Sequence, residues 1–264
     1  MAFEVTILGS GTLVPSSTRR SAGHYVTSGS IHVLMDCGSG TLHGMARWGA
    51  AWDRISHILL THFHTDHVGD LAPLLFALSH GSSPRRTDPL TVVGPPGVHR
   101  LMDRLAQAFG AYVLDPGFPL EVLELARDSV WSDESCGLGV STHPTLHTDS
   151  SVAYRLETDA GTVSYTGDTG PQAGLGRFFR GTELMIAECS YPDPPKVETH
   201  LTPSGLATLA AEASPDLLVV THIYPDLDSD AVPDLLAQAG YGGRVRVAED
   251  GLVVSLAGGE AHVR

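Results

Sequence analysis

The chain has 264 residues, a length that suits one or two domains and can bury a sizeable hydrophobic core. Its hydrophobic content of 42% excludes a disordered, collagen-like or coiled-coil protein, and its net charge of −14 disfavours a general nucleic-acid binder. No apolar run is long enough for a membrane span, and Glu4 without a basic segment argues against a signal peptide. The three cysteines are widely spaced and odd in number, which favours reduced thiols and a cytoplasmic protein.

Apolar periodicity predicts strands and helices along the whole chain. Residues 3–9 alternate and predict a strand, and Gly29 and Ser30 predict a hairpin between strands at 24–28 and 31–37. The other predicted elements are helices at 40–48, 68–79, 96–109, 203–213 and 231–239, and strands at 55–60, 90–94, 139–143, 151–158, 161–166, 184–187, 216–220, 244–248 and 252–256. Because strands and helices are mixed without a linker, we expect one domain over residues 1–264 with a layered α/β or α+β architecture.

The two halves of the chain resemble each other weakly. VLMDCGSG at 33–40 is similar to VSYTGDTG at 163–170, and ISHILLTH at 55–62 is similar to DLLVVTH at 216–222. Short apolar strands can produce such similarity by chance. If the halves instead stack as similar units, they bring four side chains to one edge, namely Asp36, His62, Asp168 and His222.

Histidine is unusually frequent, with 14 residues, and the segment THFHTDHVGD at 61–70 concentrates it. In an extended segment alternate side chains point the same way, so His62 and His64 can bind one metal ion. Asp66 and His67 lie where the chain turns into the next helix and can reach a second ion. Imidazole and carboxylate suit zinc, manganese or iron. A solvated histidine-rich loop is the alternative, which this density directly after a buried strand disfavours.

Three later residues offer further ligands. His147 precedes a predicted strand, Asp168 follows one in the YTGDTG turn, and His222 ends the LLVVTH strand. Each can therefore be held rigidly at a sheet edge. Taken singly, a histidine or aspartate in such a position is more often structural than a ligand.

The order HxHxDH, then His147, Asp168 in a Gly-Asp-Thr turn and His222 after a threonine resembles the metallo-β-lactamase superfamily over essentially the whole chain. Within it, ILGSGTLVPSSTRRSAG, LMDCGSG, LLTHFHTDHVGDL and AECSY…THLTPSG…VVTHIY resemble the ribonuclease Z-like phosphodiesterase branch. The resemblance implies an αββα sandwich of two mixed sheets flanked by helices, with a binuclear site at one edge. A homodimer is also an expectation at the level of the family.

The resemblance also implies a ligand set for two divalent metal ions, expected to be Zn²⁺, with Mn²⁺ or Fe²⁺ as alternatives. Asp66 disfavours the branch of mononuclear iron dioxygenases, in which the second metal site is incomplete. The implied ligands are His62, His64 and His147 on the first ion and Asp66, His67 and His222 on the second, with Asp168 bridging.

Two metal ions about 3.5–4 Å apart would lower the pKa of a shared water, and the bridging hydroxide would attack an electrophile in line. Asp66 would orient that hydroxide or accept its proton. An alkoxide leaving group still needs a proton, and His200 in THLTPSG is the best candidate for this general acid. It resembles the histidine of the His-Ser-Thr stretch that donates the proton in ribonuclease Z. The alternative for His200 is an ordinary surface-loop histidine.

Five other residues are weaker candidates. Glu188 could hydrogen-bond His200 or a ligand, and Asp36 could brace a ligand histidine; a solvated carboxylate and a turn-forming aspartate are the respective alternatives. For substrate phosphate we consider Arg19, Arg20 and Tyr224, although solvated charges explain the arginines equally well.

Two departures from ribonuclease Z bear on the substrate. GPPGVHRLMDRLAQAFGAYVLDPGFPLEVLEL leaves no room for that family's long basic insertion that grips tRNA. The stretch YPDLD after the last ligand is acidic where the family has a basic residue, and the family's His-Glu-Ala-Thr stretch is Ala-Glu-Cys-Ser at 187–190. With the acidic net charge, these features predict a small-molecule phosphodiester substrate and make nucleic acid an unlikely partner.

Three rival functions stay open. One is a tRNA 3′-processing endonuclease. Another is a lactonase or thioesterase-type hydrolase of the same fold, for which His200 would be dispensable. The third is a non-catalytic module stabilised by metal, which the complete ligand set disfavours.

Overall fold

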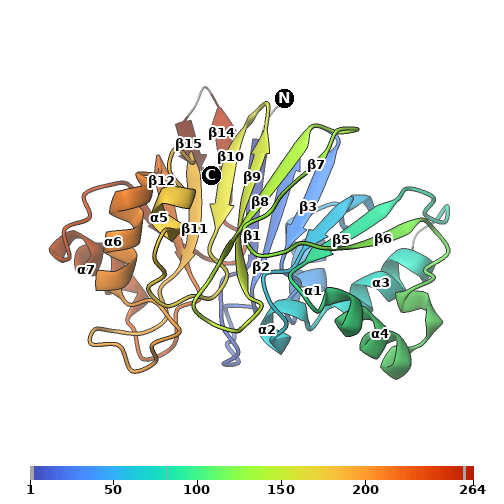
Figure 1. Ribbon diagram of the computed structural model, residues 1–264, viewed down its shortest axis with the longest axis horizontal. Helices are drawn as coiled ribbons and strands as arrows, with labels where there is room; N and C mark the ends of the chain where they lie inside the picture. The colour runs from blue at the N-terminus through green and yellow to red at the C-terminus, as the bar shows by residue number, and fades with distance from the viewer. Residues whose placement is uncertain (1–2, 82, 258–259) are drawn as a thin grey trace.

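The computed structural model describes residues 3–81, 83–257 and 260–264, and within these ranges two β-sheets face each other (Figure 1). The eight-stranded sheet has the order β15 (Glu260–Val263), β14 (Val253–Ala257), β1 (Phe3–Gly9), β2 (Gly23–Ser28), β3 (Ile31–Met35), β4 (His57–Leu59), β5 (Leu90–Gly94) and β6 (Leu120–Glu124). The seven-stranded sheet has the order β13 (Val245–Val247), β12 (Leu217–Thr221), β11 (Leu184–Glu188), β10 (Gly161–Tyr165), β9 (Val152–Thr158), β8 (Leu138–Pro144) and β7 (Val130–Asp133). Both sheets contain parallel and antiparallel pairs.

Helices cover the outer face of each sheet. α1 (Thr41–Trp48), α2 (Thr65–Val68), α3 (Leu71–His80) and α4 (Val98–Phe109) lie on the flank of the first sheet, and α5 (Leu175–Phe178), α6 (Pro203–Ala213) and α7 (Val232–Gln238) lie on the flank of the second (Figure 1). Short 3₁₀ helices are η1 (Trp52–Arg54), η2 (Ala111–Val113) and η3 (Ser229–Ala231). No helix of the described residues is both long and apolar enough to cross a membrane.

The core has three layers of apolar packing. Phe3, Val5 and Ile7 of β1 belong to the cluster between the two sheets, which matches the predicted alternation of that strand. Leu71 and Leu75 of α3 pack in the cluster outside the first sheet, and the small residues of α6 pack outside the second. Two sheets enclosed by two helical layers confirm the predicted αββα sandwich.

Parallel pairing brings several strand ends to one edge of the sandwich. β3, β4, β5 and β6 run parallel in the first sheet, and β10, β11, β12 and β13 run parallel in the second. Because the carboxyl ends of parallel strands lie at the same edge, the loops after β3, β4, β10 and β12 converge there. These loops carry most of the predicted ligands.

The structure differs from the prediction in a few elements. The helix expected over 68–79 is two helices, because the chain turns at Gly69 and Asp70, where Asp70 accepts a hydrogen bond from the backbone of Leu42. The strands β6, β7 and β15 were not predicted. β7 is an edge strand with exposed positions and a terminal aspartate, so its apolar pattern is weak.

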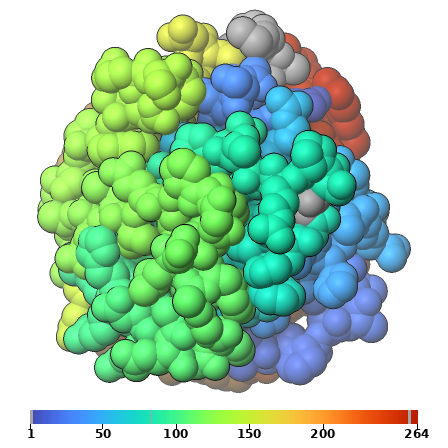
Figure 2. All heavy atoms as spheres, turned by 90° about the vertical axis from the view of Figure 1, so that its right-hand side faces the viewer, coloured from blue at the N-terminus to red at the C-terminus, as the bar shows by residue number. Residues whose placement is uncertain are grey.

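The flank of the first sheet is where the long basic insertion of ribonuclease Z is expected to be missing. From α4 the chain runs through η2 directly to β6, and Figure 2 shows this flank, with the green residues that follow α4 over much of it. The segment is therefore filled by helix, turn and strand, as expected for a chain without the long basic arm.

Candidate metal centre

Local backbone geometry positions the histidine-rich segment. His64 is the N-cap of the four-residue helix α2, in an extended conformation, and this single turn carries Asp66 and His67. His62 lies in the loop just before it, after β4. Extended chain followed by one helical turn points the four side chains toward the same edge of the sheets.

Two site residues have a left-handed backbone. Asp36 follows β3 with φ 56°, and His222 follows β12 with φ 56°. Residues other than glycine rarely adopt this conformation, and such strain gathers at functional sites. In the two similar segments of the chain, Asp36 corresponds to Thr166 and His222 corresponds to His62. The strand ends of both halves do meet at one edge, as the repeat predicted.

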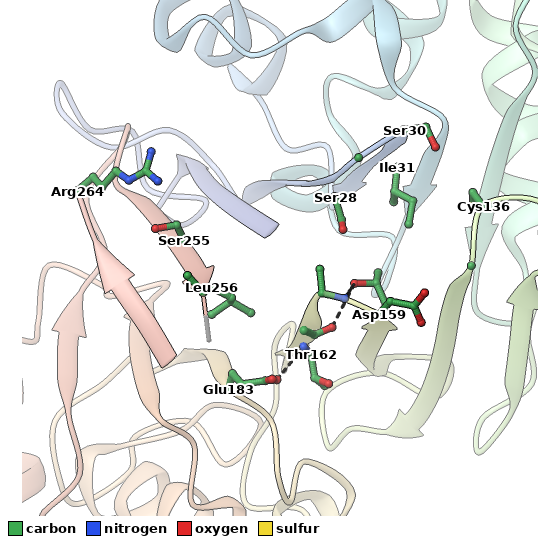
Figure 3. Close-up of a pocket in the computed structure, with 16 residues that line it drawn as sticks. Ser28, Ser30, Ile31, Cys136, Asp159, Thr162, Glu183, Ser255, Leu256 and Arg264 are labelled. Atoms are coloured by element: carbon green, nitrogen blue, oxygen red, sulfur yellow. Dashed lines mark hydrogen bonds between the residues drawn. The ribbon is translucent and has the colours of Figure 1, made fainter. Parts of the chain in front are cut away.

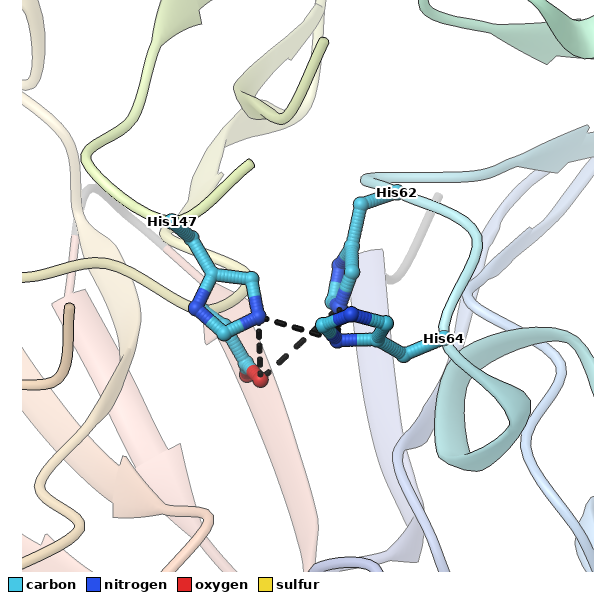
Figure 4. A group of neighbouring side chains, drawn as sticks. His62, His64 and His147 are labelled. Atoms are coloured by element: carbon cyan, nitrogen blue, oxygen red, sulfur yellow. Dashed lines mark hydrogen bonds and ion pairs between the residues drawn. The ribbon is translucent and has the colours of Figure 1, made fainter. Parts of the chain in front are cut away.

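The first candidate metal position joins three imidazoles and a carboxylate (Figure 4). The Nδ1 atom of His64 lies 3.1 Å from Nε2 of His62 and 3.0 Å from Nε2 of His147. The Oδ2 atom of Asp168 lies 3.6 Å from Nε2 of His147 and 3.9 Å from Nε2 of His62. These donor atoms surround one point, as the ligands of a single ion would.

The second candidate position lies on the other side of the same carboxylate. The Oδ1 atom of Asp168 is 3.3 Å from Nε2 of His67 and 3.4 Å from Nε2 of His222. Asp66 contributes Oδ2 at 3.5 Å from His222 and 3.9 Å from His67. The two oxygens of Asp168 therefore face the two clusters separately, the arrangement that a bridging carboxylate needs.

Unpaired polar atoms show that these residues suit metal ions. The Nε2 atoms of His67 and His222 and the Oδ1 atom of Asp168 are buried and have no hydrogen-bond partner among the described residues. A buried polar atom without a partner is costly, and coordination of a cation would satisfy all three. Imidazole and carboxylate donors fit Zn²⁺, Mn²⁺ or Fe²⁺.

The electrostatics of the centre also favour bound positive charge. Burial lowers the pKa of His67, but Asp168 and Asp36 outweigh it and hold that pKa well above its ordinary value. Burial raises the pKa of Asp168, but His222 and His67 outweigh it and keep that pKa well below its ordinary value. The carboxylates thus stay ionised in a buried place where a cation compensates them.

Asp36 holds one candidate ligand, His67, from behind. Its Oδ2 atom lies 2.7 Å from Nδ1 of His67 and accepts a hydrogen bond of 2.9 Å from the hydroxyl of Tyr165. Its Oδ1 atom accepts a hydrogen bond of 2.8 Å from the backbone of Thr61. With Nδ1 held in this way, the Nε2 atom of His67 faces the second cluster.

Glu188 lies behind a second pair of histidines. Its Oε1 atom is 2.9 Å from Nδ1 of His200, and its Oε2 atom accepts a hydrogen bond of 2.5 Å from Ser190. The Ser190 hydroxyl is also 3.1 Å from Nδ1 of His222. Burial lowers the pKa of His200, but the hydrogen bond and charge of Glu188 outweigh it and raise that pKa above its ordinary value.

A groove reaches the centre from the loop after β1. A cavity of about 390 Å³ is lined by Leu13, Pro15 and Asp66 among others. On its other side a smaller cavity of about 200 Å³ touches Tyr224. Tyr224 stacks on Tyr191 with ring centroids 4.7 Å apart, and both rings lie within 6 Å of the ring of His200, at 5.9 Å and 5.8 Å.

The two arginines considered for phosphate binding are engaged elsewhere. Arg19 donates to the backbone oxygen of Ala248 at 2.6 Å and to Ser10, and Arg20 pairs with Asp250 at 3.0 Å. These contacts fasten the loop after β1 to the body of the protein. A substrate phosphate would have to compete with them.

Sequence reasoning missed Ser190 and Tyr191. Both stand in the AECSY motif, but a serine and a tyrosine beside a cysteine carry no distinctive metal or acid–base pattern. Their position beside the metal centre becomes visible only once the fold pairs Glu188 with His200, which lies 12 positions further along the chain.

Comparisons with known proteins agree with this geometry. A family model described as "Beta-lactamase superfamily domain" matches residues 32–223. A ribonuclease Z of Mycolicibacterium paratuberculosis is 30% identical, with 94% of this chain and 96% of that protein covered. The metallo-β-lactamase fold protein YhfI from Bacillus subtilis has a TM-score of 0.84 at 23% identity, covering 97% of this chain and 100% of that one.

The short form of human tRNase Z has a TM-score of 0.77 at 24% identity, covering 96% of this chain and 99% of that one. At these identities the two solved structures establish the fold. The family match covers most of the chain, and the donor residues of a metal centre lie together at the sheet edge. The chain therefore belongs to the beta-lactamase superfamily, as a metal-dependent hydrolase of the metallo-β-lactamase fold with similarity to ribonuclease Z.

Proposed function

We propose that this protein is a binuclear phosphodiesterase that hydrolyses small phosphodiesters. The observation that carries the proposal is the pair of donor clusters on the two oxygens of Asp168, with a buried His200–Glu188 pair beside them. A double cation site suits attack on phosphorus, and an adjacent acid suits departure of an alkoxide.

The ligand residues have different tasks in this proposal. His62, His64 and His147 would hold one ion, Asp66, His67 and His222 the other, and Asp168 both. When bound, two Zn²⁺ ions supply Lewis-acid polarisation of the phosphoryl group and make water more acidic. Asp66, at the mouth of the groove, would orient the attacking water and receive its proton.

His200 would act as the general acid. Glu188 holds its Nδ1 atom, so Nε2 is the nitrogen left to give a proton to the departing oxygen. The raised pKa keeps the ring protonated at higher pH than an ordinary histidine. Because His200 is only 7% exposed, bulk water has little access to the proton before the leaving group receives it.

The groove favours a small diester with an aromatic or heterocyclic portion. The stacked Tyr191–Tyr224 pair beside His200 gives a flat apolar wall on the side of the proposed acid. A ring on the substrate could pack there while the phosphate reaches the metal centre. A cyclic nucleotide or an aryl phosphodiester has this composition.

Cleavage of the 3′ end of precursor tRNA is the second candidate. It is favoured by the relatives named ribonuclease Z, which match 94% of this chain. Their similarity makes the prediction against nucleic acid, drawn from the net charge, doubtful. The acidic surface still removes the electrostatic attraction that usually drives tRNA binding.

Parallel assays separate the two candidates. The purified, metal-loaded protein is given bis(p-nitrophenyl) phosphate, a 2′,3′-cyclic nucleotide, a lactone and a thioester, and a precursor tRNA at low and physiological salt. We expect efficient hydrolysis of the small diesters and negligible tRNA cleavage at physiological salt. Efficient, correctly positioned tRNA cleavage would instead establish the second candidate, and hydrolysis of lactones or thioesters alone would reject both.

A further inference from the structure

A second cluster of metal-binding residue types lies away from the centre described above. It consists of His57, Asp133 and Cys136, whose donor atoms all lie within 4.8 Å of one another. His57 begins β4, whereas His62 follows the end of that strand, so the two sites are about 17 Å apart along an extended chain. Asp133 ends β7 and Cys136 lies in the turn to β8. The cluster therefore joins the two sheets.

Neighbouring hydroxyl groups aim the donors of this cluster at one another. The Nδ1 atom of His57 lies 2.9 Å from the hydroxyl of Ser56, which can donate in turn to the backbone oxygen of His32 at 3.1 Å. Without an ion, Nε2 can donate to Asp133; with an ion bound, Nδ1 would carry the proton of the ring and Nε2 would present its lone pair to the ion. This is the usual state of a metal-bound histidine, whose other nitrogen is held by a hydrogen bond.

The carboxylate is oriented in the same manner. Oδ1 of Asp133 accepts hydrogen bonds from the backbone and hydroxyl of Ser135, at 3.0 Å and 2.6 Å. Its Oδ2 atom is left facing Nε2 of His57 at 3.2 Å. The Sγ atom of Cys136 lies 3.7 Å from the backbone oxygen of Asp133 and also interacts with the Asp133 carboxyl group. Three donors of different types thus converge at this point.

The geometry does not suit a nucleophilic Cys–His–Asp triad. Such a triad needs one ring nitrogen of the histidine for the cysteine and the other for the aspartate. Here Asp133 faces Nε2 of His57 and Ser56 occupies Nδ1, so neither ring nitrogen is left for Cys136 alone. Burial, followed by the charge of Asp133, also raises the pKa of the Cys136 thiol, the reverse of an activated nucleophile.

We propose that His57, Asp133 and Cys136 form a further metal site, selective for Zn²⁺ or a similar borderline-soft ion, that clamps the two sheets together. Thiolate, imidazole and carboxylate are zinc ligands, and tetrahedral ligands at zinc distances stand roughly 3.2–3.8 Å apart. Small side-chain rotations bring the three donors to that spacing. Binding displaces the thiol proton, so each ion bound to Cys136 releases one proton to solvent.

The fourth position of the site opens to solvent. Cys136 lines a cavity of about 920 Å³ between the sheets at this end of the molecule, where Figure 3 shows it beside the hairpin residues Ser28 and Ile31. Water from this cavity can complete the coordination. The cavity also gives an ion a path to the cluster.

Cobalt binding tests the site without reference to activity. Cys37 and Cys189 are buried and belong to no ligand cluster in the described ranges, and the catalytic centre offers only nitrogen and oxygen donors. A thiolate-to-Co²⁺ charge-transfer band in the near ultraviolet therefore reports Cys136 alone. We expect metal-free protein titrated with Co²⁺ to develop this band after the stronger binuclear centre has filled, with an amplitude that saturates at one cysteine-bound ion per chain.

Variants and thiol chemistry complete the test. Cys136→Ser should lose the band and bind one ion fewer than the wild type. Asp133→Asn should need a Co²⁺ concentration more than about 10-fold higher to develop the same band. The control Cys189→Ala should keep the band. In the unmodified protein, Zn²⁺ should slow alkylation of Cys136 by iodoacetamide more than about 10-fold. Absence of the band in wild type, its survival in Cys136→Ser, or alkylation unaffected by Zn²⁺ would overturn the proposal.

Discussion

The two ends of β4 carry histidines in contrasting surroundings. Beyond the carboxyl end, the candidate ligand His67 keeps a buried nitrogen without a partner among the described residues, and so does His222, which reaches the same edge from β12. At the amino end, His57 has a neighbour for each nitrogen, Ser56 and Asp133. The comparison teaches that a strong metal centre shows itself by unpaired donors, whereas a weaker site can be closed by its own hydrogen bonds when no ion is bound.

The largest expected effect comes from Asp168, which serves both clusters. Asp168→Ala should lower kcat/KM for every substrate by more than about 10⁴-fold and reduce the catalytic metal content below two ions per chain. Elemental analysis and steady-state kinetics measure both. The matched control is His143→Ala, because His143 pairs with the exposed Asp128 away from the centre. Retention of two catalytic ions by Asp168→Ala would contradict the bridging assignment.

His200 should show a smaller and more selective effect. His200→Ala should slow a diester with an alkyl leaving group by about 10²–10⁴-fold, because a positioned acid contributes this much. A diester with a nitrophenolate leaving group should slow much less, since that anion departs without a proton. Metal content should stay unchanged. Equal losses for both substrates would mean that His200 binds the phosphoryl group or shapes the loop.

Glu188→Gln sharpens the role of His200 through pH. The charge of Glu188 raises the pKa of His200, so the wild-type enzyme keeps its acid protonated further into the alkaline range. Loss of that charge should move the alkaline limb of the kcat/KM profile for an alkyl diester to lower pH. The limb for a nitrophenyl diester should not move with it. An unchanged pH profile for the alkyl diester would show that Glu188 does not set the pKa of the general acid.

The local part of this site could be predicted from sequence, and the distant part could not. Four candidate ligand residues within six positions, three histidines and one aspartate from His62 to His67, are recognisable by their density after an apolar strand. The opposed use of the two oxygens of Asp168 depends on how two sheets pack, which no local pattern encodes. Likewise Arg20 pairs with Asp250 across 230 positions, so this competitor for a substrate phosphate could be found only from the fold.

The strands show the same contrast between what the sequence predicts and what it does not. β1 and the β2–β3 hairpin bury one or both faces and have strong apolar patterns, so their prediction is confirmed. β6 and β7 lie at sheet edges and are half exposed, and their composition resembles that of loops. The cluster at His57 depends on β7, which is why sequence analysis could not assemble it.

Asp36→Asn tests how much the contact of Asp36 with Nδ1 of His67 contributes to metal binding at Nε2 of the same ring. The substitution weakens the hold on Nδ1 of His67 and removes a buried charge. We expect the affinity for the second metal ion to fall about 10–100-fold, as for other residues that orient a ligand. Competition with a chromogenic chelator measures this. Tyr165→Phe, which removes only the 2.9 Å hydrogen bond to Asp36, should give a smaller loss. An effect of Tyr165→Phe as large as that of Asp36→Asn would assign the loss to packing.

The smallest expected effect concerns acid stability and compares His24 with His57. Burial, with the charges of His67 and His222, lowers the pKa of His24 to about 3, and both of its nitrogens lack a partner among the described residues. The unfolded chain titrates near about 6.5, so it binds more protons below that pH, and folding loses stability as pH falls from 6.5 toward 3. At pH 5 the loss is about 2 kcal/mol.

With chelator present, His24→Phe should flatten the dependence of the urea midpoint on pH between 7 and 5. Burial also lowers the pKa of His57, but Asp133 opposes this, so His57→Phe should flatten the slope less. A larger change for His57→Phe would mean that the Asp133 contact does not offset its burial.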